Sequence, residues 1–338
     1  MRIVVVGGSG NVGTAVLRAA LAAGHEVAGV SRRGPARGGP YDAVTWHSLD
    51  LTSASAPDVL TEVVRGADAV VHAAWAIQPS HDREYLRDVN VQGSRTVAEA
   101  VAAAGVPRLV YLSSVGTYAP RVSLEPVDES WPATGVPTSM YSEDKAAVEA
   151  LLDRFEAANP AVAVTRLRPG LVLQRDAAAE IRRYFIGALV PRPLWGLARR
   201  GNLPVLPLPA GLALQFVHAD DVATAAVTAA ERGVRGAVNL AAEPAVDALD
   251  LADITGGRVV RVPAKVVRAA VDLAWRARVL PTSPGWLDLA LSIPLMRADR
   301  AAAELDWHPV HGAAATVTEL LGGLSEGRGV PASPALHP

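Results

Sequence analysis

The stretch RIVVVGGSGNVGTAV (residues 2–16) decides the fold of this chain. Its apolar, β-branched start predicts a buried strand over 2–7, and the pattern after it predicts a helix over 11–24. Between them the chain has G-x-x-G-x-x-G spacing, which lets the backbone approach a pyrophosphate held by the helix N-terminus. The stretch therefore predicts a dinucleotide site, with a purely structural glycine turn as the alternative. The expected cofactor contacts in this loop are Gly7, Gly10, Asn11, Val12 and Gly13.

Apolar runs alternate with helical patterns through the first 175 residues. Strands that alternate with helices of this length predict parallel βαβ units, so the fold class is α/β, a doubly wound parallel (Rossmann) sheet. The expected strands cover 25–31, 44–51, 68–74, 108–114, 162–170 and 236–242, and the expected helices cover 56–66, 82–104 and 139–158, with a strand and then a helix across 216–232.

Two segments interrupt this alternation. Residues 117–138 are proline-rich and predict a long loop, and residues 175–214 show no clean period. From about residue 244 the pattern is helical and irregular. We predict a dinucleotide-binding domain over 1–174 plus 215–243, and a smaller, discontinuous substrate-binding domain or lid over 175–214 plus 244–330, followed by a disordered tail at 331–338.

The bulk composition excludes several classes of function. The chain has 338 residues, a net charge of −2 and no cysteine, so disulfides and thiolate chemistry are ruled out. Near-neutral charge gives no broad attraction to nucleic acid or to an anionic membrane. The start does not read as a signal peptide, and no apolar run reaches the ~18 residues that a membrane span needs. A cytoplasmic protein is expected, acting on a small molecule.

The second expected strand ends in GVSRR (residues 29–33). An NAD site usually places an acidic residue near this point, where it binds the ribose hydroxyls. Here Ser31, Arg32 and Arg33 offer donors and positive charge instead, which favours NADP over NAD; two solvated surface arginines are the alternative. After the next strand, Asp50 and Leu51 are a candidate adenine contact.

One of only two lysines in the chain, Lys145, follows Tyr141 by four residues in a predicted helix. Spacing of i and i+4 places both side chains on one helix face. A tyrosine normally titrates near pH 10, and a nearby ammonium would favour its phenolate, making it a better acid or base at neutral pH. A solvated helix lysine is the alternative.

Taken together, the glycine loop, the strand ending in YLSS (residues 111–114) and the Tyr-x-x-x-Lys pair resemble the short-chain dehydrogenase/reductase superfamily. The segments FVHADDVA (216–223) and ADRAAAELDWHP (298–309) resemble its extended branch, the NAD(P)-dependent epimerase/dehydratase family. The resemblance implies that Tyr141 is the general acid/base, that Ser114 rather than Ser113 binds the reacting oxygen, and that Lys145 holds the nicotinamide ribose.

The same resemblance implies further roles. Asn90 would anchor a water relay behind the lysine, although a polar residue on a wet helix face is the alternative. Ala73 and Ala74 would pass the cofactor, Pro169 would lie on the nicotinamide side, and Trp75 and Gly170 would contact substrate, with a core tryptophan as the alternative for Trp75. A homodimer is implied through the helices near 85–104 and 141–158.

Departures from the family pattern narrow the reaction. Nucleotide-sugar epimerases of this family usually place an arginine where this chain has Gln215, and sugar dehydratases place an acid pair where it has Val115 and Gly116. Simple hydride transfer remains, so an NADP-dependent carbonyl reductase or alcohol dehydrogenase is favoured. The alternatives are a nucleotide-sugar epimerase or ketoreductase, and a cofactor-sensing protein without turnover.

Other charged residues carry weaker predictions. Arginines of the expected lid would face solvent for the most part, although a diphosphate or carboxylate is an alternative use for them. No grouping of His, Asp and Glu predicts a metal site, and three scattered histidines read as structural. The arginines are Arg175, Arg182, Arg183, Arg192, Arg199 and Arg200, and the histidines are His72, His218 and His308.

Overall fold

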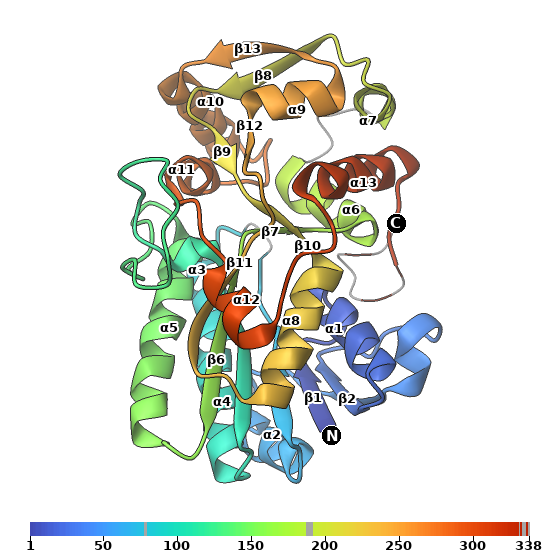
Figure 1. The fold of residues 1–338 in the computed structure, drawn as a ribbon, viewed down its shortest axis with the longest axis vertical. Coiled ribbons are helices and arrows are strands. Elements are labelled where there is room, and N and C mark those ends of the chain that lie inside the picture. The colour runs from blue at the N-terminus through green and yellow to red at the C-terminus, as the bar shows by residue number, and fades with distance from the viewer. Residues whose placement is uncertain (78–79, 187–191, 331, 333–335, 337–338) are drawn as a thin grey trace.

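A computed structural model describes residues 1–77, 80–186, 192–330, 332 and 336 of the chain (Figure 1). Its centre is a seven-stranded sheet in the order β11-β6-β5-β4-β1-β2-β3, in which every neighbouring pair is parallel. This confirms the predicted doubly wound α/β fold. The strands are β1 (Arg2–Val6), β2 (Glu26–Ser31), β3 (Thr45–Ser48), β4 (Ala69–His72), β5 (Arg108–Leu112), β6 (Ala163–Pro169) and β11 (Gly236–Leu240).

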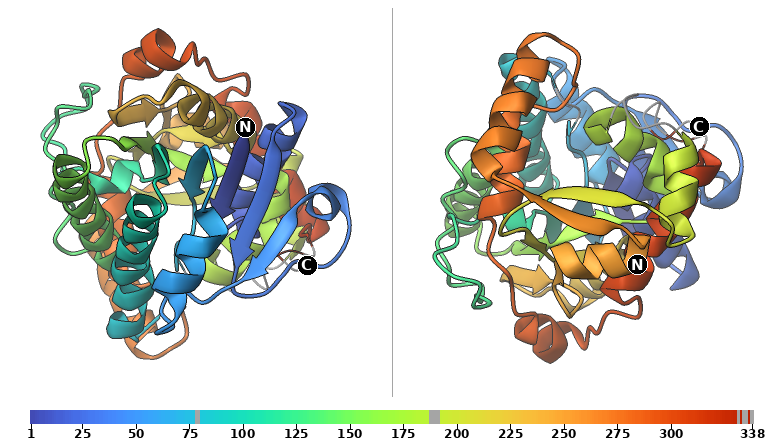
Figure 2. Two further views of the ribbon diagram at one scale, coloured as in Figure 1. Left: turned by 90° about the horizontal axis from the view of Figure 1, so that it is seen from below. Right: turned by 90° about the horizontal axis from the view of Figure 1, so that it is seen from above.

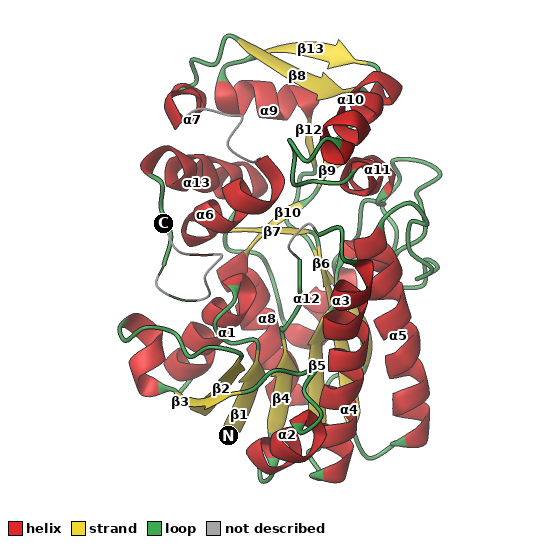
Figure 3. Ribbon diagram, turned by 180° about the vertical axis from the view of Figure 1, so that it is seen from behind, coloured by secondary structure: helices red, strands yellow, loops and turns green. Residues whose placement is uncertain are grey.

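Helices cover both faces of the sheet (Figures 1 and 3). One face packs on α1 (Asn11–Ala22) and α8 (Ala219–Arg232), in one apolar cluster with β1 and β4. The other packs on α2 (Ala56–Val64), α4 (Gly93–Ala103) and α5 (Met140–Ala158). Burial on both faces explains why the central strands are apolar at successive positions rather than alternating.

The helix predicted over 82–104 is interrupted. It consists of α3 (Arg83–Arg87), a π-helical turn η2 (Asp88–Gln92) and α4. Such single π turns insert one extra residue per turn and often mark functional positions. Asn90 lies in this turn and is buried.

The segment 175–214, whose sequence shows no clean period, nevertheless contains regular elements. It has η4 (Arg175–Ala177), α6 (Ala178–Ile181), the π turn η5 (Arg182–Ile186), α7 (Arg192–Arg199), β8 (Val205–Pro209) and β9 (Ala213–Leu214). Strand β8 reads VLPLP, and proline is tolerated because this strand has a single neighbour. That neighbour, β13 (Arg258–Val262), comes about fifty residues later, where a local pattern cannot reveal the pairing.

The chain beyond residue 243 is more varied than the predicted helical pattern. Its helices are α9 (Ala248–Thr255), α10 (Ala264–Arg276), α11 (Pro284–Ser292), α12 (Asp299–Leu305) and α13 (Ala313–Glu326), and its strands are β12 (Val246–Asp247), which pairs with β9, and β13. Most of these elements lie beyond the carboxyl edge of the sheet (Figure 1), and in the view from above they lie in front of it (Figure 2, right). Helix α12 instead packs beside β11 and α8.

The chain crosses between the seven-stranded sheet and the elements beyond its carboxyl edge along two short strands, β7 (Leu171–Leu173) and β10 (Phe216–His218), which pair in parallel.

The end of the chain is packed at the positions that the structure describes. Leu336 is 1% exposed and belongs to the apolar cluster around α1 and α8. The tail predicted as disordered is therefore buried at this residue, while 331, 333–335 and 337–338 lie outside the described residues.

Candidate active site

The predicted site residues gather at one edge of the sheet. Since all seven strands are parallel, their carboxyl ends meet there, and doubly wound folds bind ligands at that edge. The glycine loop follows β1, the arginine pair follows β2, the alanines and Trp75 follow β4, Ser113 and Ser114 follow β5, and Pro169 ends β6. Tyr141 and Lys145 come to this edge on the first turns of α5.

The glycine loop has the geometry that a dinucleotide pyrophosphate requires. Gly7 has φ +87°, and a Cβ there would overlap the backbone of Ala74 after β4. A Cβ on Gly13 would overlap the carbonyl of Gly7. The first turn of α1 has no acidic residue, and Gly10 before it supplies no side-chain cap. The first N–H groups of α1 and the positive end of its dipole are therefore free to bind an anion at the loop. These residues fit an anionic cofactor group.

Gln174 is a contact to this loop that sequence reasoning missed. Its amide nitrogen donates to the backbone carbonyl of Asn11 at 3.1 Å and also to the Asn11 side-chain oxygen. Arg18 Nη2 in turn donates to the Gln174 oxygen at 3.1 Å and to Asp220 at 2.5 Å. Gln174 is 163 residues from Asn11 in the sequence, so no local pattern indicates this contact. Only the fold shows that Gln174 holds the glycine loop in place.

The two arginines after β2, Arg32 and Arg33, are exposed. Arg32 Nη1 donates to the Tyr85 hydroxyl at 2.7 Å, and Ser31 Oγ donates to the carbonyl of Arg33 at 2.8 Å. Asp50 accepts from the Thr52 amide at 3.0 Å, which lowers the pKa of its carboxyl, with the charge of Arg32 adding to the effect. Leu51 is buried against Gly93. Arg32 and Asp50 are thus brought together, as an adenosine site at this edge would need.

Tyr141 lies directly against the backbone that follows Ser114. A Cβ on Gly116 would stand 2.9 Å from Cε1 of the Tyr141 ring, so a glycine at 116 permits this approach. Ser114 Oγ accepts from the Gly116 amide at 3.0 Å. Burial raises the pKa of Tyr141 to about 12, and a hydrogen bond with Ser114 acts in the opposite direction. Ser113 points elsewhere, donating to Glu149 at 2.6 Å, so Ser114 is the serine beside the tyrosine.

Lys145 is 3% exposed, so it is not a solvated helix lysine. Its Nζ donates to the carbonyl of Leu112 at 2.7 Å and to the Tyr111 hydroxyl at 3.3 Å, and it lies 3.6 Å from the centroid of the Trp75 ring. Burial lowers the pKa of Lys145 well below its usual value, against the opposing charges of Glu149 and Asp144. The prediction that Lys145 lowers the pKa of Tyr141 was wrong for this structure, because burial of the tyrosine outweighs other influences.

Trp75 packs against Tyr141, and Asn90 is buried beside the segment that follows β4. The Trp75 ring meets Tyr141 edge-on with centroids 5.9 Å apart. Asn90 is 2% exposed and binds the backbone of Ala76 twice, accepting from its amide at 2.7 Å and donating to its carbonyl at 3.2 Å. The wet-face alternative for Asn90 was therefore wrong, and the water relay stays a prediction. The side chain fixes the path of the chain after β4.

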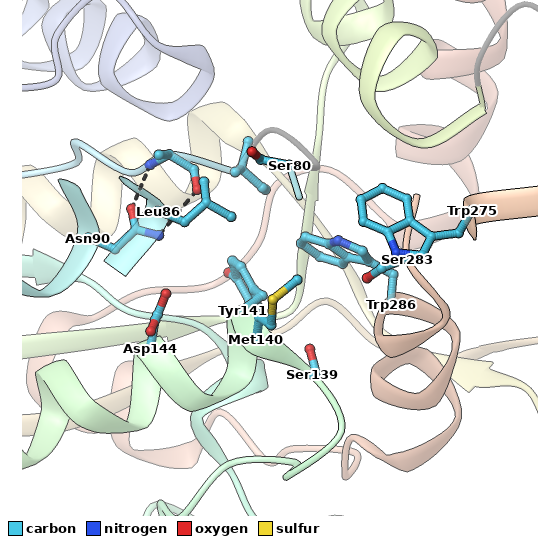
Figure 4. Close-up of a pocket in the computed structure, with 12 residues that line it drawn as sticks. Ser80, Leu86, Asn90, Ser139, Met140, Tyr141, Asp144, Trp275, Ser283 and Trp286 are labelled. Carbon is cyan, nitrogen blue, oxygen red and sulfur yellow. Dashed lines mark hydrogen bonds between the residues drawn. The ribbon is translucent and has the colours of Figure 1, made fainter. Parts of the chain in front are cut away.

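A pocket opens beside Tyr141, between the start of α5, the segment after β4 and helices α10 and α11 (Figure 4). Sequence reasoning missed its aromatic residues Trp275 and Trp286, because nothing local in the irregular C-terminal segment links them to residue 141. The three predicted substrate contacts, Trp75, Ser114 and Gly170, are not among the residues that line this pocket. A Cβ on Gly170 would overlap the carbonyl of Gln215, so Gly170 packs against β10.

Glu180 on α6 is a partly buried carboxylate that has no hydrogen bond or ion pair among the described residues, and burial raises its pKa to about 7. The folded protein therefore holds this proton more tightly than the unfolded chain, and stability falls as pH rises from the ordinary glutamate pKa through about 7. We expect Glu180→Gln to raise the free energy of unfolding at pH 8 by about 1–3 kcal/mol, allowing for partial exposure. At pH 5 the gain should be much smaller.

Urea denaturation at pH 5 and pH 8 measures this effect. The exposed Glu99→Gln on α4 is the matched control and should change stability little at either pH. An equal gain for Glu180→Gln at both pH values would contradict a raised carboxyl pKa at this position.

The remaining charged predictions have mixed outcomes. Arg175 and Arg199 both pair with Glu326 on α13, which leaves them little freedom for a ligand. Arg183 and Arg200 are exposed and Arg182 is partly buried, whereas the side chain of Arg192 lies outside what the structure describes. His72 is buried, which lowers its pKa to about 3 together with the charge of Lys145.

Two absences hold for the described part of the chain. Its residues include no cluster of three or more His, Asp or Glu side chains that could hold a metal ion. Within the same ranges, no helix combines the length and the apolar character that a membrane crossing requires.

Comparisons with known proteins agree with this architecture. A 4-hydroxy-2-methyl-3-oxo-4-farnesyl-3,4-dihydroquinoline-1-oxide ketoreductase of Stigmatella aurantiaca is 28% identical over 322 residues, which is 91% of this chain and 92% of that protein. A decarboxylating sterol-4-alpha-carboxylate 3-dehydrogenase of Saccharomyces cerevisiae is 36% identical over 112 residues, and this chain covers 32% of its own length and 30% of that relative.

Among solved structures, UDP-glucose 4-epimerase of Thermotoga maritima has a TM-score of 0.71 at 18% identity, covering 97% of this chain and 99% of that one. At this identity the likeness shows the fold alone. The model of the NAD dependent epimerase/dehydratase family matches residues 3–241. On that match, which spans the glycine loop, Ser114, Tyr141 and Lys145, the chain belongs to the NAD-dependent epimerase/dehydratase family and is an NAD(P)-dependent enzyme.

Proposed function

We propose that this enzyme transfers hydride between NADP and a carbonyl or alcohol group of a small molecule, with Tyr141 as the general acid/base. The observation that carries the proposal is the contact of Tyr141 with the Ser114–Gly116 backbone at the carboxyl edge of the sheet, with Lys145 buried one helical turn on.

The chain offers a cradle for the cofactor along the same edge. Gly7 to Gly13 would hold the pyrophosphate, Arg32 and Arg33 a 2′-phosphate, and Lys145 the ribose beside the nicotinamide. The ammonium of Lys145 has three donors, of which two are used by Leu112 and Tyr111. When bound, the nicotinamide supplies the hydride.

The protein groups handle the proton. With a pKa of about 12, the Tyr141 hydroxyl stays protonated at neutral pH, so in reduction it is ready to give its proton to the new alkoxide. Ser114 Oγ accepts from the Gly116 amide and its hydroxyl bonds with Tyr141, and we expect its hydrogen to turn to the same substrate oxygen when substrate binds. Charge that develops on that oxygen would thus meet two fixed donors.

Epimerisation of a nucleotide sugar is less well supported. At the position where the family resemblance places a diphosphate-binding arginine, Gln215 is buried and uses both amide atoms on Met296, donating at 2.9 Å and accepting at 2.7 Å. It is neutral and held on the backbone of Met296, so it cannot supply the positive charge that an arginine would give to a diphosphate.

The preference for NADP is tested by removing the two arginines after β2. We expect the double variant Arg32→Ala and Arg33→Ala to bind NADPH about 10²- to 10⁴-fold more weakly, since each of the two lost charge-assisted hydrogen bonds is worth about 1.5–3 kcal/mol. NADH binding should change by less than about threefold. Titration of both cofactors by nicotinamide fluorescence measures this.

The matched control is Arg95→Ala, an exposed arginine on α4 that contacts Gln92. It should leave both affinities unchanged. Equal weakening of NADH and NADPH by the double variant, or tighter binding of NADH by the unaltered protein, would refute the NADP assignment.

A further inference from the structure

The pocket beside Tyr141 is walled mainly by aromatic and aliphatic side chains. The hollow measures about 410 Å³ when the open solvent around it is included, and the room in it for the centres of water molecules is about 20 Å³. Its lining comes from three parts of the chain that are far apart in sequence, as Figure 4 shows: Ala76, Ile77, Ser80, Leu86 and Asn90; Ser139, Met140, Tyr141 and Asp144; and Trp275, Ser283 and Trp286.

Flat rings lie beside the Tyr141 ring and in the lining of the pocket. The Trp286 ring lies 4.8 Å from the Tyr141 ring, centroid to centroid, at an interplanar angle of 37°. Phe185 braces Trp286 edge-on at 4.8 Å and 82°. Trp275, which also lines the pocket, stacks on His81 with ring centroids 3.6 Å apart and an interplanar angle of 3°. Aromatic side chains held in this way present rigid apolar faces, which favour a flat ring in a ligand.

Two polar side chains of the pocket, Asn90 and Ser139, bond to the protein itself. Both amide atoms of Asn90 bind Ala76. The Ser139 hydroxyl caps α5 by accepting from Ser142. A sugar ring placed here would bury several hydroxyls against apolar walls with few partners, and an unpaired buried hydroxyl opposes binding.

Charge in the pocket also disfavours phosphate. The one ionisable carboxylate in its lining, Asp144, is 1% exposed and forms a bidentate ion pair with Arg83, at 2.6 and 2.7 Å. Among the residues that the structure describes, no arginine or lysine lines the pocket. A ligand diphosphate would therefore approach an already neutralised pair and find no free cation there.

We infer that the substrate is an uncharged, flat ring compound, an aromatic or fused-ring ketone or the matching alcohol, whose ring packs against Trp286 while its oxygen reaches Tyr141. This inference rests on the proposed function, because it takes Tyr141 as the group that meets the substrate oxygen. It adds the chemical class of the substrate, which neither the fold nor the family decides.

Binding to the complex of the protein with NADP⁺ tests the substrate class without turnover, because a ketone cannot accept hydride from the oxidised cofactor. Three probes separate the possibilities in calorimetric titrations: 1-tetralone, 1-decalone with the same carbon skeleton but no flat ring, and UDP-glucose. We expect 1-tetralone to bind about tenfold more tightly than 1-decalone, and UDP-glucose not to bind. Equal binding of the two ketones, no binding of either, or tighter binding of UDP-glucose would overturn the inference.

Variants of Trp286 then locate the ring. Trp286→Leu should weaken 1-tetralone binding about tenfold, whereas Trp286→Phe, which keeps a ring, should stay within about threefold. Trp131→Leu is the matched control, because Trp131 does not line the pocket and its Nε1 donates to the carbonyl of Ala119 at 3.1 Å. Equal losses in Trp286→Leu and Trp131→Leu would also overturn the inference.

Turnover separates this inference from the proposed function. Oxidation of NADPH in the presence of 1-tetralone and of aliphatic ketones is followed by absorbance. If 1-tetralone binds as expected but no ketone is reduced and no alcohol oxidised, the proposed function fails and the ring site stands. If aliphatic ketones are reduced as well as 1-tetralone, with no effect of Trp286→Leu, the proposed function stands and the ring site fails.

Discussion

Tyr141→Phe is expected to lower kcat by about a thousandfold while leaving the fold and cofactor binding intact, since general acid–base catalysis contributes about 10²- to 10⁴-fold. The substitution removes one oxygen from the cleft. The phenylalanine ring can keep the packing against Trp75 and Trp286 and the close approach to Gly116. Steady-state kinetics with a reducible ketone measures the loss of kcat, and NADPH titration of the variant measures cofactor binding.

The pH dependence of the unaltered enzyme checks the same assignment. Because burial raises the pKa of Tyr141 to about 12, reduction should be insensitive to the ionisation of this hydroxyl across neutral pH. Alcohol oxidation needs the phenolate, so its rate should still rise with pH at pH 10, and this rise should vanish in Tyr141→Phe.

Tyr41→Phe is the matched control for the loss of a tyrosine hydroxyl. Tyr41 bonds to Thr14 at 3.0 Å, away from the pocket beside Tyr141, and its loss should change kcat by less than about threefold. Near-normal kcat in Tyr141→Phe would refute the assignment of Tyr141 as acid/base.

The parts of the fold that could be predicted from sequence are those in which the signal is local. The β1–α1 unit is one example, because its apolar strand, its glycines and its helix are consecutive residues. From there, parallel strands oblige their carboxyl ends to meet, so the positions of Arg32, Ser114 and Tyr141 at one edge followed from chain order alone.

The parts that could not be predicted depend on contacts between distant segments. Trp286 reaches Tyr141 from 145 positions away, and β8 finds its partner only in β13. The pKa of Tyr141 was predicted in the wrong direction for a related reason. Helical spacing showed that Lys145 shares its face, but not how deeply the surrounding segments bury the hydroxyl, and burial decides the sign.

The charged network behind Ser113 gives the largest stability effect that we expect. Arg168 on β6 and Glu149 on α5 form a bidentate ion pair with both distances 2.9 Å, and the residues are 5% and 2% exposed. Burial by itself lowers the pKa of Arg168, but the hydrogen bonds and charge of Glu149 outweigh it and raise that pKa. Arg168 also donates to the hydroxyl of Tyr118 at 2.9 Å.

Arg168→Met is expected to lower the free energy of unfolding by about 3–5 kcal/mol, because it leaves the Glu149 carboxylate buried without its main partner. Arg166, whose Nε lies 3.9 Å from Glu149, compensates only in part. Guanidinium denaturation followed by circular dichroism measures the change, and Arg65→Met, which breaks the exposed pair with Glu62, is the control expected to change stability far less.

The double variant Arg168→Met and Glu149→Leu separates an unpaired charge from lost packing. If the unpaired carboxylate causes the destabilisation, the double variant should recover about half of the loss or more, since replacing both members of a buried pair is often close to neutral. Recovery would be incomplete, because Ser113 and Tyr118 also lose partners. A double variant less stable than Arg168→Met alone would show that the arginine contributes mainly through packing at β6, and that Glu149 tolerates burial without it.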